Sequence, residues 1–472
     1  MWTIKHSYID GAFVPVQGRE TIECINPATE SVIGTVTLAN RDDARQAIAA
    51  AQRAQVTMGR TSKAERIDML KRLQAAVLES TEEIRDTAIE EYGAPLARAQ
   101  WVSQYASQSF VNAAQILENY ELVRPVGRAS VVMEPVGVSA LFAPWNSTAG
   151  TVCSKLAAAI AGGCASVIKP SELSPLQTQV LALALHRAEL PNGVINIVSG
   201  RGGEVGDEIS TSPHIAKISF TGSTATGKLI ARAGIETMKR VSLSLTGKSA
   251  SIVLDDADLE AAIPMALNAA FMNNGQACVA GTRLLVPRAF LPQVIERVRA
   301  LVDAIVVGNP HDPATAIGPL VNQAQFDRVQ GFIRRGLEQG ARLIVGGEGR
   351  PAGLSQGYFV KPTVFADVSN DMDIAREEIF GPVLSIIAYD DEQDAIRLAN
   401  ASVYGLQAYV FTREAGRGRR IAARLEAGSV LINRIAPELL APFGGVKQSG
   451  IGREFGVSGL EAFLEAKSIV ED

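Results

Sequence analysis

The sequence contains little cysteine or histidine, with four residues of each among 472. The cysteines are Cys24, Cys153, Cys164 and Cys278, and the histidines are His6, His186, His214 and His311. The cysteines lack C-x-x-C spacing and the histidines form no ligand-like pair, which argues against a disulfide framework, a zinc site and a histidine-based triad. We therefore expect no metal, and any enzymatic chemistry has to come from Cys, Glu, Lys and Asn side chains.

The sequence also lacks a long apolar run and an excess of basic residues. Its most apolar helical stretches, such as KLAAAIAGG, stop well short of the roughly 20 residues that span a bilayer. Its N-terminal residues, MWTIKHSYIDGAFVPV, lack the pattern of a signal peptide. A net charge of −5 gives no electrostatic reason for nucleic-acid binding. We expect no membrane or nucleic-acid partner and a cytoplasmic location.

The chain has the composition and length of a globular protein with two or three domains, since 47% of its residues are apolar and 20% are charged. The early region reads as helical. Ser62 and Glu65 form a capping box, apolar residues follow at helical spacing, and Gly93 with Pro95 marks a stop.

The rest of the chain reads as two α/β series. From 136 to 254, short apolar runs alternate with helical stretches, which predicts βαβ units and a parallel sheet. The runs are VGVSALFA, ASVIKP, VINIV, IAKISF and ASIVL. A second series follows from about 260 to 440. Residues 121–136 read as a hairpin, and the C-terminal LEAFLEAKSIVED reads as a short helix followed by a strand. Both segments are candidates for pairing with a neighbouring subunit.

FTGSTATGKL, residues 220–229, follows a predicted strand and opens a predicted helix, where a helix N-terminus attracts anions. The glycine and lysine spacing resembles a phosphate-binding P-loop, but Leu229 stands where that motif needs Ser or Thr to hold magnesium. A P-loop ATPase is therefore a distant alternative. A second alternative is that these glycines only form a tight strand-to-helix turn.

Two further segments follow predicted strands. In SVIKPSE, Lys169 and Glu172 could hold ribose hydroxyls, or could belong to an ordinary solvated loop. In APWNSTAG, Asn146 could donate to a developing oxyanion, or could simply cap the next helix. In NNGQACVAGT, Cys278 could be a nucleophile, or a small buried filler as most free cysteines are.

Together these segments resemble the aldehyde dehydrogenase superfamily, from about residue 8 to the C-terminus. The motifs that carry the resemblance occur in family order. They are PWN at 144–146, KPSE at 169–172, FTGSTATG at 220–227, GQAC at 275–278, DPATAIGPL at 312–320, EEIFGPV at 377–383 and PFGGVKQSGIGRE at 442–454.

The resemblance implies an α/β fold with a Rossmann-like, parallel-sheet cofactor domain, an α/β catalytic domain and a small β oligomerisation arm. The expected ranges are 1–120 and 137–246 for the NAD(P)-binding domain, 247–442 for the catalytic domain, and 121–136 with 456–472 for the arm. It also implies a homodimer or homotetramer formed through that arm.

The resemblance further implies oxidation of a small-molecule aldehyde to a carboxylic acid. Cys278 would attack the aldehyde carbon, and Asn146 and the Cys278 N–H would hold the oxyanion. Hydride transfer to the nicotinamide would leave a thioester for a base-activated water to hydrolyse. The implied cofactor-binding residues are Phe142, Ala143, Trp145, Lys169, Ser171, Glu172, Gly202, Gly206, Phe220, Gly222, Ser223, Leu245, Glu378 and Phe380.

The sequence departs from the family pattern at the base. Hydrolytic members carry a motif similar to L-E-L-G-G-K, whose glutamate activates the water, whereas LSLTGKS here puts Ser244 at that position. Three explanations stay open. Glu454 with Lys155 could provide a carboxylate–lysine proton path, the acyl group could pass to coenzyme A, or the chain could be a slow, inactivated or non-catalytic relative.

The substrate pocket and cofactor preference also differ from the common pattern. Small residues follow Asn146, namely Ser147, Thr148, Gly150, Thr151 and Ser154, which predicts a channel wide enough for a bulky or aromatic aldehyde. Arg434 and Glu438 lie in the loop before PFGG and could contact a charged group. Glu172 would bind a free 2′-hydroxyl and repel a 2′-phosphate, which favours NAD, with NADP still possible.

Overall fold

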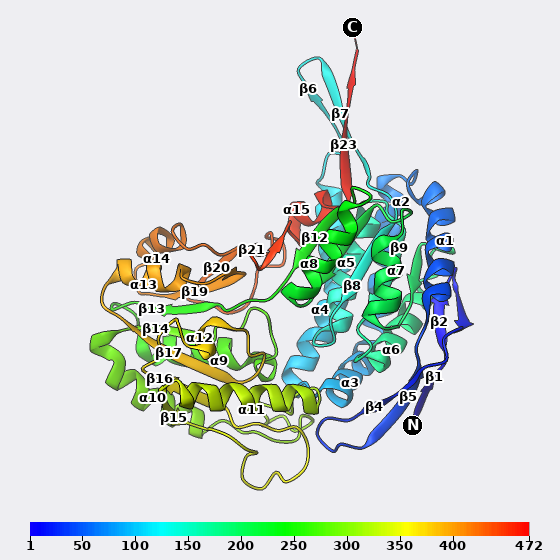
Figure 1. The fold of residues 1–472 in the computed structure, drawn as a ribbon. Coiled ribbons are helices and arrows are strands. Elements are labelled where there is room, and N and C mark those ends of the chain that lie inside the picture. Colours follow the sequence, from blue (N-terminus) through cyan, green and yellow to red (C-terminus); the bar gives the residue numbers. More distant parts are fainter. Residues whose placement is uncertain (472) are drawn as a thin grey trace.

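The computed structural model describes residues 1–471, and Figure 1 shows two α/β bodies with a thin ribbon of strands projecting from one of them. The first body is built on an eight-stranded sheet in the order β22-β12-β11-β8-β9-β10-β2-β3. Its strands are β2 (His6–Ile9), β3 (Ala12–Pro15), β8 (Ser139–Ala143), β9 (Ser166–Pro170), β10 (Ile195–Ile197), β11 (Lys217–Thr221), β12 (Arg240–Ser244) and β22 (Gly450–Ile451).

The five central strands of this sheet are parallel, in the order β10-β9-β8-β11-β12. The chain runs outward from β8 through β9 to β10, then returns to the other side of β8 for β11 and β12. The direction of winding therefore reverses between β8 and β11, and a crevice at the carboxyl ends of the strands is expected where it reverses. The helices of this body are α1 (Arg41–Met58), α2 (Lys63–Leu78), α3 (Thr81–Tyr92), α4 (Leu96–Glu118), α5 (Thr148–Ala161), α6 (Pro175–Arg187), α7 (Asp207–Thr211) and α8 (Thr224–Ile235).

The second body has a seven-stranded sheet in the order β15-β16-β17-β14-β13-β19-β20, parallel except for the edge strand β15. Its strands are β13 (Ala250–Val253), β14 (Arg283–Pro287), β15 (Arg342–Val345), β16 (Thr363–Ala366), β17 (Val383–Tyr389), β19 (Gln407–Phe411) and β20 (Ser429–Ile432). Its helices are α9 (Leu259–Phe271), α10 (Leu291–Asp303), α11 (Gln323–Glu338), α12 (Asp373–Arg376), α13 (Glu392–Asn400) and α14 (Ala415–Ala422).

The projecting ribbon is a three-stranded antiparallel sheet, β23-β7-β6, made of β6 (Val123–Val126), β7 (Ala129–Pro135) and β23 (Leu464–Val470). The predicted hairpin and C-terminal helix-then-strand are therefore confirmed, with α15 (Gly456–Glu461) preceding β23. Two small sheets complete the fold. They contain β1 (Trp2–Ile4), β4 (Thr21–Ile25) and β5 (Val32–Thr37), and β18 (Tyr404–Gly405) with β21 (Val446–Lys447). Residue 472 of the predicted arm lies outside the described residues.

Two details of the sequence-based interpretation need correction. The helical region from Ser62 to Gly93 is two helices, because the capping box starts α2, α2 ends at Leu78 and α3 begins at Thr81. The strand predicted from ASIVL, β13, belongs to the second sheet, because it pairs with β14 and β19 rather than with the strands before it. Sequence periodicity identifies a buried strand but does not identify its neighbours.

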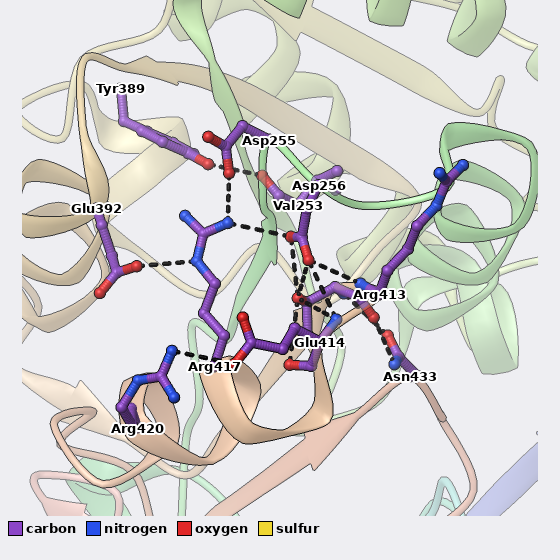
Figure 2. Close-up of polar contacts among 11 residues, drawn as sticks. Val253, Asp255, Asp256, Tyr389, Glu392, Arg413, Glu414, Arg417, Arg420 and Asn433 are labelled. Carbon is purple, nitrogen blue, oxygen red and sulfur yellow. Dashed lines mark hydrogen bonds and ion pairs between the residues drawn. The ribbon is translucent and has the colours of Figure 1, made fainter.

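A charged cluster fixes the carboxyl end of the second sheet (Figure 2). Asp256, just beyond β13, accepts hydrogen bonds from the Thr412 hydroxyl at 2.7 Å and from the Arg413 and Glu414 N–H groups at 3.1 Å. Arg417 of α14 lies 3.2 Å from the same carboxylate. Burial raises the pKa of Asp256, but these hydrogen bonds and the Arg417 charge outweigh it, so the pKa is lowered overall. The ionised carboxylate thus links β13, β19 and α14.

No helix among residues 1–471 is long and apolar enough to cross a membrane.

Candidate active site

A short left-handed turn stands just before Cys278. Asn273, Asn274 and Gly275 have φ angles of 55°, 60° and 71°, so three successive residues adopt a conformation that L-residues rarely adopt. Left-handed backbone costs roughly 1–2 kcal/mol for a residue with a side chain. Such a turn persists only where surrounding contacts hold it, and strain of this kind is concentrated at functional sites.

Asn274 holds the turn against segments from both bodies. Its amide nitrogen donates to the carbonyls of Gly93 and Pro319, each at 2.9 Å, and its side-chain oxygen accepts from the Gly318 N–H at 2.7 Å. The side chain is fully buried. All three bonds join the turn to backbone that is distant in sequence. They hold it against the segment between α3 and α4 and against the loop before α11.

Asn273 and Asn146 meet at the Gln276 carbonyl, two residues before Cys278. The Asn146 amide nitrogen donates to this carbonyl at 2.7 Å, and the Asn273 amide nitrogen donates to it at 3.0 Å. Asn273 also donates to the Asn146 carbonyl at 3.2 Å and accepts from the Tyr92 hydroxyl. Asn146 therefore has a fixed orientation and keeps one amide hydrogen for another acceptor.

Cys278 is partly exposed, whereas the other three cysteines are buried. A side chain at Gly247 would place its Cβ 2.1 Å from the Cys278 carbonyl oxygen, so glycine is required for the two segments to pack this closely. Burial raises the pKa of the Cys278 thiol well above its ordinary value, and the charges of Glu378 and Glu454 add to the increase, while Arg98 opposes it. The thiol is protonated at neutral pH and needs a proton acceptor before it can attack.

Glu454 and Lys155 form a buried ion pair beside the same site. The Lys155 Nζ lies 2.5 Å from the Glu454 Oε1 and also donates to the Ser219 hydroxyl at 2.8 Å. The Lys155 side chain is 1% exposed and that of Glu454 is 15% exposed, so the carboxylate keeps contact with the cavity. Ser244 lies at the end of β12 and faces this cavity as well.

Cys278, Asn146, Ser244 and Glu454 all line one cavity of about 780 Å³. Its walls come from α4, α5, α9 and the loops at 305–317 and 435–455 and are mainly apolar. The aromatic lining residues are Trp101, Tyr105, Phe271, Phe443 and Phe455. Mostly apolar walls with a few fixed polar groups are typical of a site for a small organic ligand.

Some residues predicted to face the substrate do not line this cavity. Ser147, Thr151 and Ser154 line it, but Thr148 and Gly150 are turned into the protein by the helical periodicity of α5. Arg434 and Glu438 do not line this cavity either, since both are exposed and bond to their own loop. That loop instead supplies the apolar residues Ile435, Ala436, Pro437 and Leu439.

The residues predicted to bind the cofactor lie together along the carboxyl edge of the first sheet. Each of five neighbouring strands ends in or is followed by some of these residues. Strand β8 provides Phe142, Ala143 and Trp145, β9 provides Lys169, Ser171 and Glu172, and β10 provides Gly202 and Gly206. Strand β11 provides Phe220, Gly222 and Ser223, and β12 provides Leu245. This edge contains the reversal of winding between β8 and β11, where a dinucleotide is expected to bind.

Lys169 and Glu172 face one another at 3.5 Å. Burial lowers the pKa of Lys169, and Glu172 opposes that decrease. Arg201, which the sequence reading did not select, lies 3.8 Å from Glu172 and is also paired with Glu20. Ser171 takes no part in these ion pairs; its hydroxyl accepts a hydrogen bond from the Leu173 N–H within the turn.

The glycines and the helix start at this edge fit a pyrophosphate. An added Cβ at Gly202 would meet no atom of residues 1–471 within 4 Å, so the chain is open to a ligand there. Ser223 caps α8 by accepting from the Thr226 N–H, and the Thr224 N–H donates to the Thr246 hydroxyl. The positive end of the helix dipole at this cap favours an anion. Gly222 lies against the Phe220 ring, which an added Cβ would approach to 2.5 Å. The residues present therefore fit a dinucleotide.

Glu378 and Phe380 come from the second body and complete the crevice near Cys278. The Glu378 carboxylate accepts from the Gly247 N–H at 3.2 Å, and burial raises its pKa to about 7. Phe380 has a φ of 61° and packs edge-on against Trp145, with ring centroids 5.6 Å apart. The structure thus brings these predicted residues to the junction between the cofactor edge and the cysteine.

Comparisons with known proteins match this arrangement. The sequence profile of the aldehyde dehydrogenase family covers residues 13–469. The chain belongs to the aldehyde dehydrogenase family. It is 44% identical to a 3-succinoylsemialdehyde-pyridine dehydrogenase of Pseudomonas sp over 468 residues, 99% of this chain and 98% of that protein.

Solved structures of aldehyde dehydrogenases match the fold. A cysteine-to-alanine mutant of aldehyde dehydrogenase C from Pseudomonas syringae, in complex with NAD+ and octanal, has a TM-score of 0.97 and 42% identity, covering 99% of this chain and 96% of that one. Betaine aldehyde dehydrogenase from Staphylococcus aureus in complex with NAD+ has a TM-score of 0.95 and 34% identity, covering 98% and 94%.

The family and fold predicted from the sequence are confirmed. This aldehyde dehydrogenase is an enzyme that oxidises an aldehyde to a carboxylic acid with NAD(P). The coenzyme-A-acylating and non-catalytic alternatives are not favoured. The domain boundaries and the roles of the individual site residues stay predictions.

One side of the cavity was missed by sequence reasoning. Arg98, Trp101 and Tyr105 of α4 line the cavity, although α4 carries none of the family motifs. Their spacing of three and four places them on one helix face. The sequence signal that could have indicated this wall is an arginine on the same helix face as a tryptophan and a tyrosine.

Replacing Gly275 by alanine should destabilise the aldehyde dehydrogenase and abolish turnover. An added Cβ would lie 2.2 Å from the Gly381 carbonyl carbon, and the positive φ adds roughly 1–2 kcal/mol. Gly331→Ala is the matched control, because Gly331 lies inside α11 with no atom within 4 Å and alanine favours helix. Thermal unfolding and NADH formation test both variants. A Gly275→Ala protein as stable and active as the wild type would contradict the constraint.

Proposed function

We propose that Cys278 is the nucleophile of this aldehyde dehydrogenase and that it carries the acyl group between oxidation and hydrolysis. The observation that supports this most strongly is the shared cavity, which is lined by Cys278, Asn146 and Glu454. The other cysteines are buried. The partly exposed thiol loses its proton to solvent in the cavity. The thiolate then attacks the aldehyde carbon, and the negative charge moves to the aldehyde oxygen of the thiohemiacetal anion.

Asn146 and the Cys278 backbone stabilise the oxyanion in this proposal. Asn146 is fixed by its bond to the Gln276 carbonyl and keeps one amide hydrogen. Among residues 1–471 no backbone carbonyl accepts a hydrogen bond from the Cys278 N–H, so this group is also available. Two preorganised donors of this kind stabilise charge that develops in the transition state.

The cofactor is NAD, held by Lys169, Glu172, Ser223 and Glu378 along the crevice. The aldehyde dehydrogenases crystallised with NAD+ support this choice. Bound NAD would supply the hydride acceptor for oxidation of the adduct on Cys278. Lys169 and Ser171 at the same edge could tolerate the 2′-phosphate of NADP, so NADP is the second choice.

Glu454 is the base for hydrolysis of the thioester, with Lys155 as its positioning partner. Ser244 has no useful basicity near neutral pH. Glu454 is the one carboxylate among the described residues that line the cavity, and its distance of 2.5 Å from the Lys155 Nζ gives protons a path away from the site. The carboxylate accepts a proton from the water that attacks the thioester.

The substrate in this proposal is a bulky or aromatic aldehyde. The cavity of about 780 Å³ has aromatic walls, and the relative from Pseudomonas sp is named for a pyridine-bearing semialdehyde. Aromatic rings pack well against such walls.

A direct assay tests the activity. Wild-type protein mixed with NAD and a panel of aliphatic and aromatic aldehydes should form NADH, followed by its absorbance, with continued turnover and without coenzyme A. Cys278→Ala should form none, because the nucleophile is missing, whereas Cys153→Ala should retain activity because Cys153 is buried away from the cavity. The absence of NADH with every aldehyde, or a rate that requires coenzyme A, would contradict the proposal.

Pre-steady-state kinetics test the base. In Glu454→Gln, one NADH per site should form at the wild-type rate, while steady turnover falls by roughly 10²–10⁴ because deacylation has lost its base. Glu438→Gln, on the nearby loop, serves as the exposed control. Adding Ser244→Glu to Glu454→Gln should recover part of the turnover. An unchanged steady state in Glu454→Gln would show that another group is the base.

We further propose that the chain forms a homodimer or homotetramer through the arm, and that the predicted ranges act as cofactor domain, catalytic domain and arm. Residues 443–455 fall outside those ranges. They include β22, which pairs with β12, so we assign β22 to the cofactor domain. Exposed apolar residues on the arm support its role as an interface; they are Val123, Val126, Ile469 and Val470. The cytoplasmic location stays a prediction.

Light scattering tests the assembly. The wild type should have a mass of two or four chains, and Val126→Asp combined with Val470→Asp should shift it toward one chain, because charges oppose burial of that surface. Val403→Asp is the matched control, since Val403 is similarly exposed but lies outside the arm. A wild-type protein of single-chain mass would contradict the proposal.

A further inference from the structure

Arg98 lies in the first turn of α4 and faces the substrate cavity with Trp101 and Tyr105. The guanidinium carbon lies 4.4 Å from the centroid of the Trp101 ring, which in turn stacks on Tyr105 with centroids 5.1 Å apart and planes within 19°. This stack fixes the direction of the arginine side chain. The positive charge is therefore held at the cavity wall rather than extended into solvent.

No carboxylate among residues 1–471 forms an ion pair with Arg98, and its buried Nε has no hydrogen-bond partner. Arg283, a buried arginine, shows the usual arrangement. Its Nε, Nη1 and Nη2 donate to the carbonyls of Lys248, Leu398 and Ala399. Buried charges in proteins are normally paired or fully hydrogen-bonded. Arg98, which is half-buried, has no carboxylate partner among the described residues, and the Tyr92 hydroxyl is the polar group that most favours its charged form.

Arg98 is also the one lysine, arginine or histidine side chain among the described residues that line the cavity. The one carboxylate there, Glu454, is already paired with Lys155 at 2.5 Å. The titratable groups that favour the charged form of Arg98 are Tyr92, the Cys278 thiol and Tyr105. The cavity thus contains a neutralised carboxylate, a nucleophile and an unpaired guanidinium.

We propose that Arg98 binds a carboxylate group of the substrate, so that the aldehyde oxidised at Cys278 is an aldehydic acid. This inference rests on the proposed function, because it assumes that the aldehyde end reaches Cys278. A guanidinium can bind a carboxylate through two parallel hydrogen bonds, and such charge-assisted pairs are stronger where water is excluded. The aromatic and apolar walls would then contact the spacer between the two ends of the substrate.

A matched pair of substrates tests the specificity. The wild type should prefer 4-carboxybenzaldehyde to 4-methylbenzaldehyde, and 5-oxopentanoate to pentanal. In Arg98→Met, kcat/KM should fall roughly ten- to hundredfold for the carboxylates, the size expected for lost hydrogen bonds to a charged group, and stay within about threefold for the uncharged partners. Arg434→Met, an exposed arginine of the neighbouring loop, should change neither.

The uncharged substrates separate two roles of Arg98. If the arginine served only to stabilise the Cys278 thiolate, Arg98→Met would reduce kcat/KM equally for both members of each pair and move the pH profile to higher pH. That result, or an unchanged preference between the members, would overturn the proposal.

A binding experiment works without turnover and so does not depend on the proposed reaction. In Cys278→Ala, calorimetry should detect binding of terephthalate or glutarate, and adding Arg98→Met should remove it. Either compound should raise the melting temperature of the wild type but not of Arg98→Met. Binding that survives Arg98→Met would overturn the inference, even if the enzyme proves active. Binding that depends on Arg98 in a protein with no activity would support the inference while contradicting the proposed function.

Arg98→Met also shows whether the arginine has a structural role. Removing an unpaired buried charge should leave the melting temperature without ligand unchanged or higher. A lower melting temperature would show that the stack of Arg98 on Trp101 also contributes to the stability of the fold.

Discussion

The left-handed turn formed by Asn273, Asn274 and Gly275 is the constraint on which the site depends. The turn is unfavourable by itself, and it persists because Asn274 is bonded to three backbone groups far away in sequence. The same turn carries Asn273, which shares an acceptor with Asn146. The cysteine loop, the oxyanion donor and the loops of both α/β bodies are therefore fixed by one buried hydrogen-bond network, and loss of any member leaves buried polar groups unpaired.

The electrostatics of the cavity follow from how little charge it contains. Burial raises the pKa of the Cys278 thiol and raises that of Glu378 to about 7, so the ionised form of both groups is disfavoured relative to water. Glu454 is paired with the cationic Lys155, whereas no carboxylate among residues 1–471 is paired with Arg98. A low-dielectric cavity strengthens each interaction within it. In the same cavity an unpaired charge is energetically unfavourable unless a ligand of opposite charge compensates it, and this supports a ligand at Arg98.

The first sheet explains why the cofactor and the cysteine meet. The winding reverses between β8 and β11, so the loops after β8, β9, β11 and β12 open at one edge. Glu378 and Phe380 reach this edge from the second body. Residues 443–455 do the reverse: they leave the second body, add β22 to the first sheet and bring Glu454 to Lys155. Each body thus contributes residues to the site, and neither body forms the whole site alone.

The sequence by itself determined the family, the alternation of strands and helices and the identity of the cysteine, because these depend on ordered motifs and on local periodicity. It also identified Glu454 and Lys155 as candidate partners, which the structure places in contact. Only the tertiary structure decided which sheet receives β13, which residues after Asn146 face the cavity, and that Arg434 and Glu438 turn away from it. Arg98 shows the reason most clearly. Whether an arginine is solvated, paired or isolated in a cavity depends on side chains from other elements, and no local pattern in the sequence records that environment.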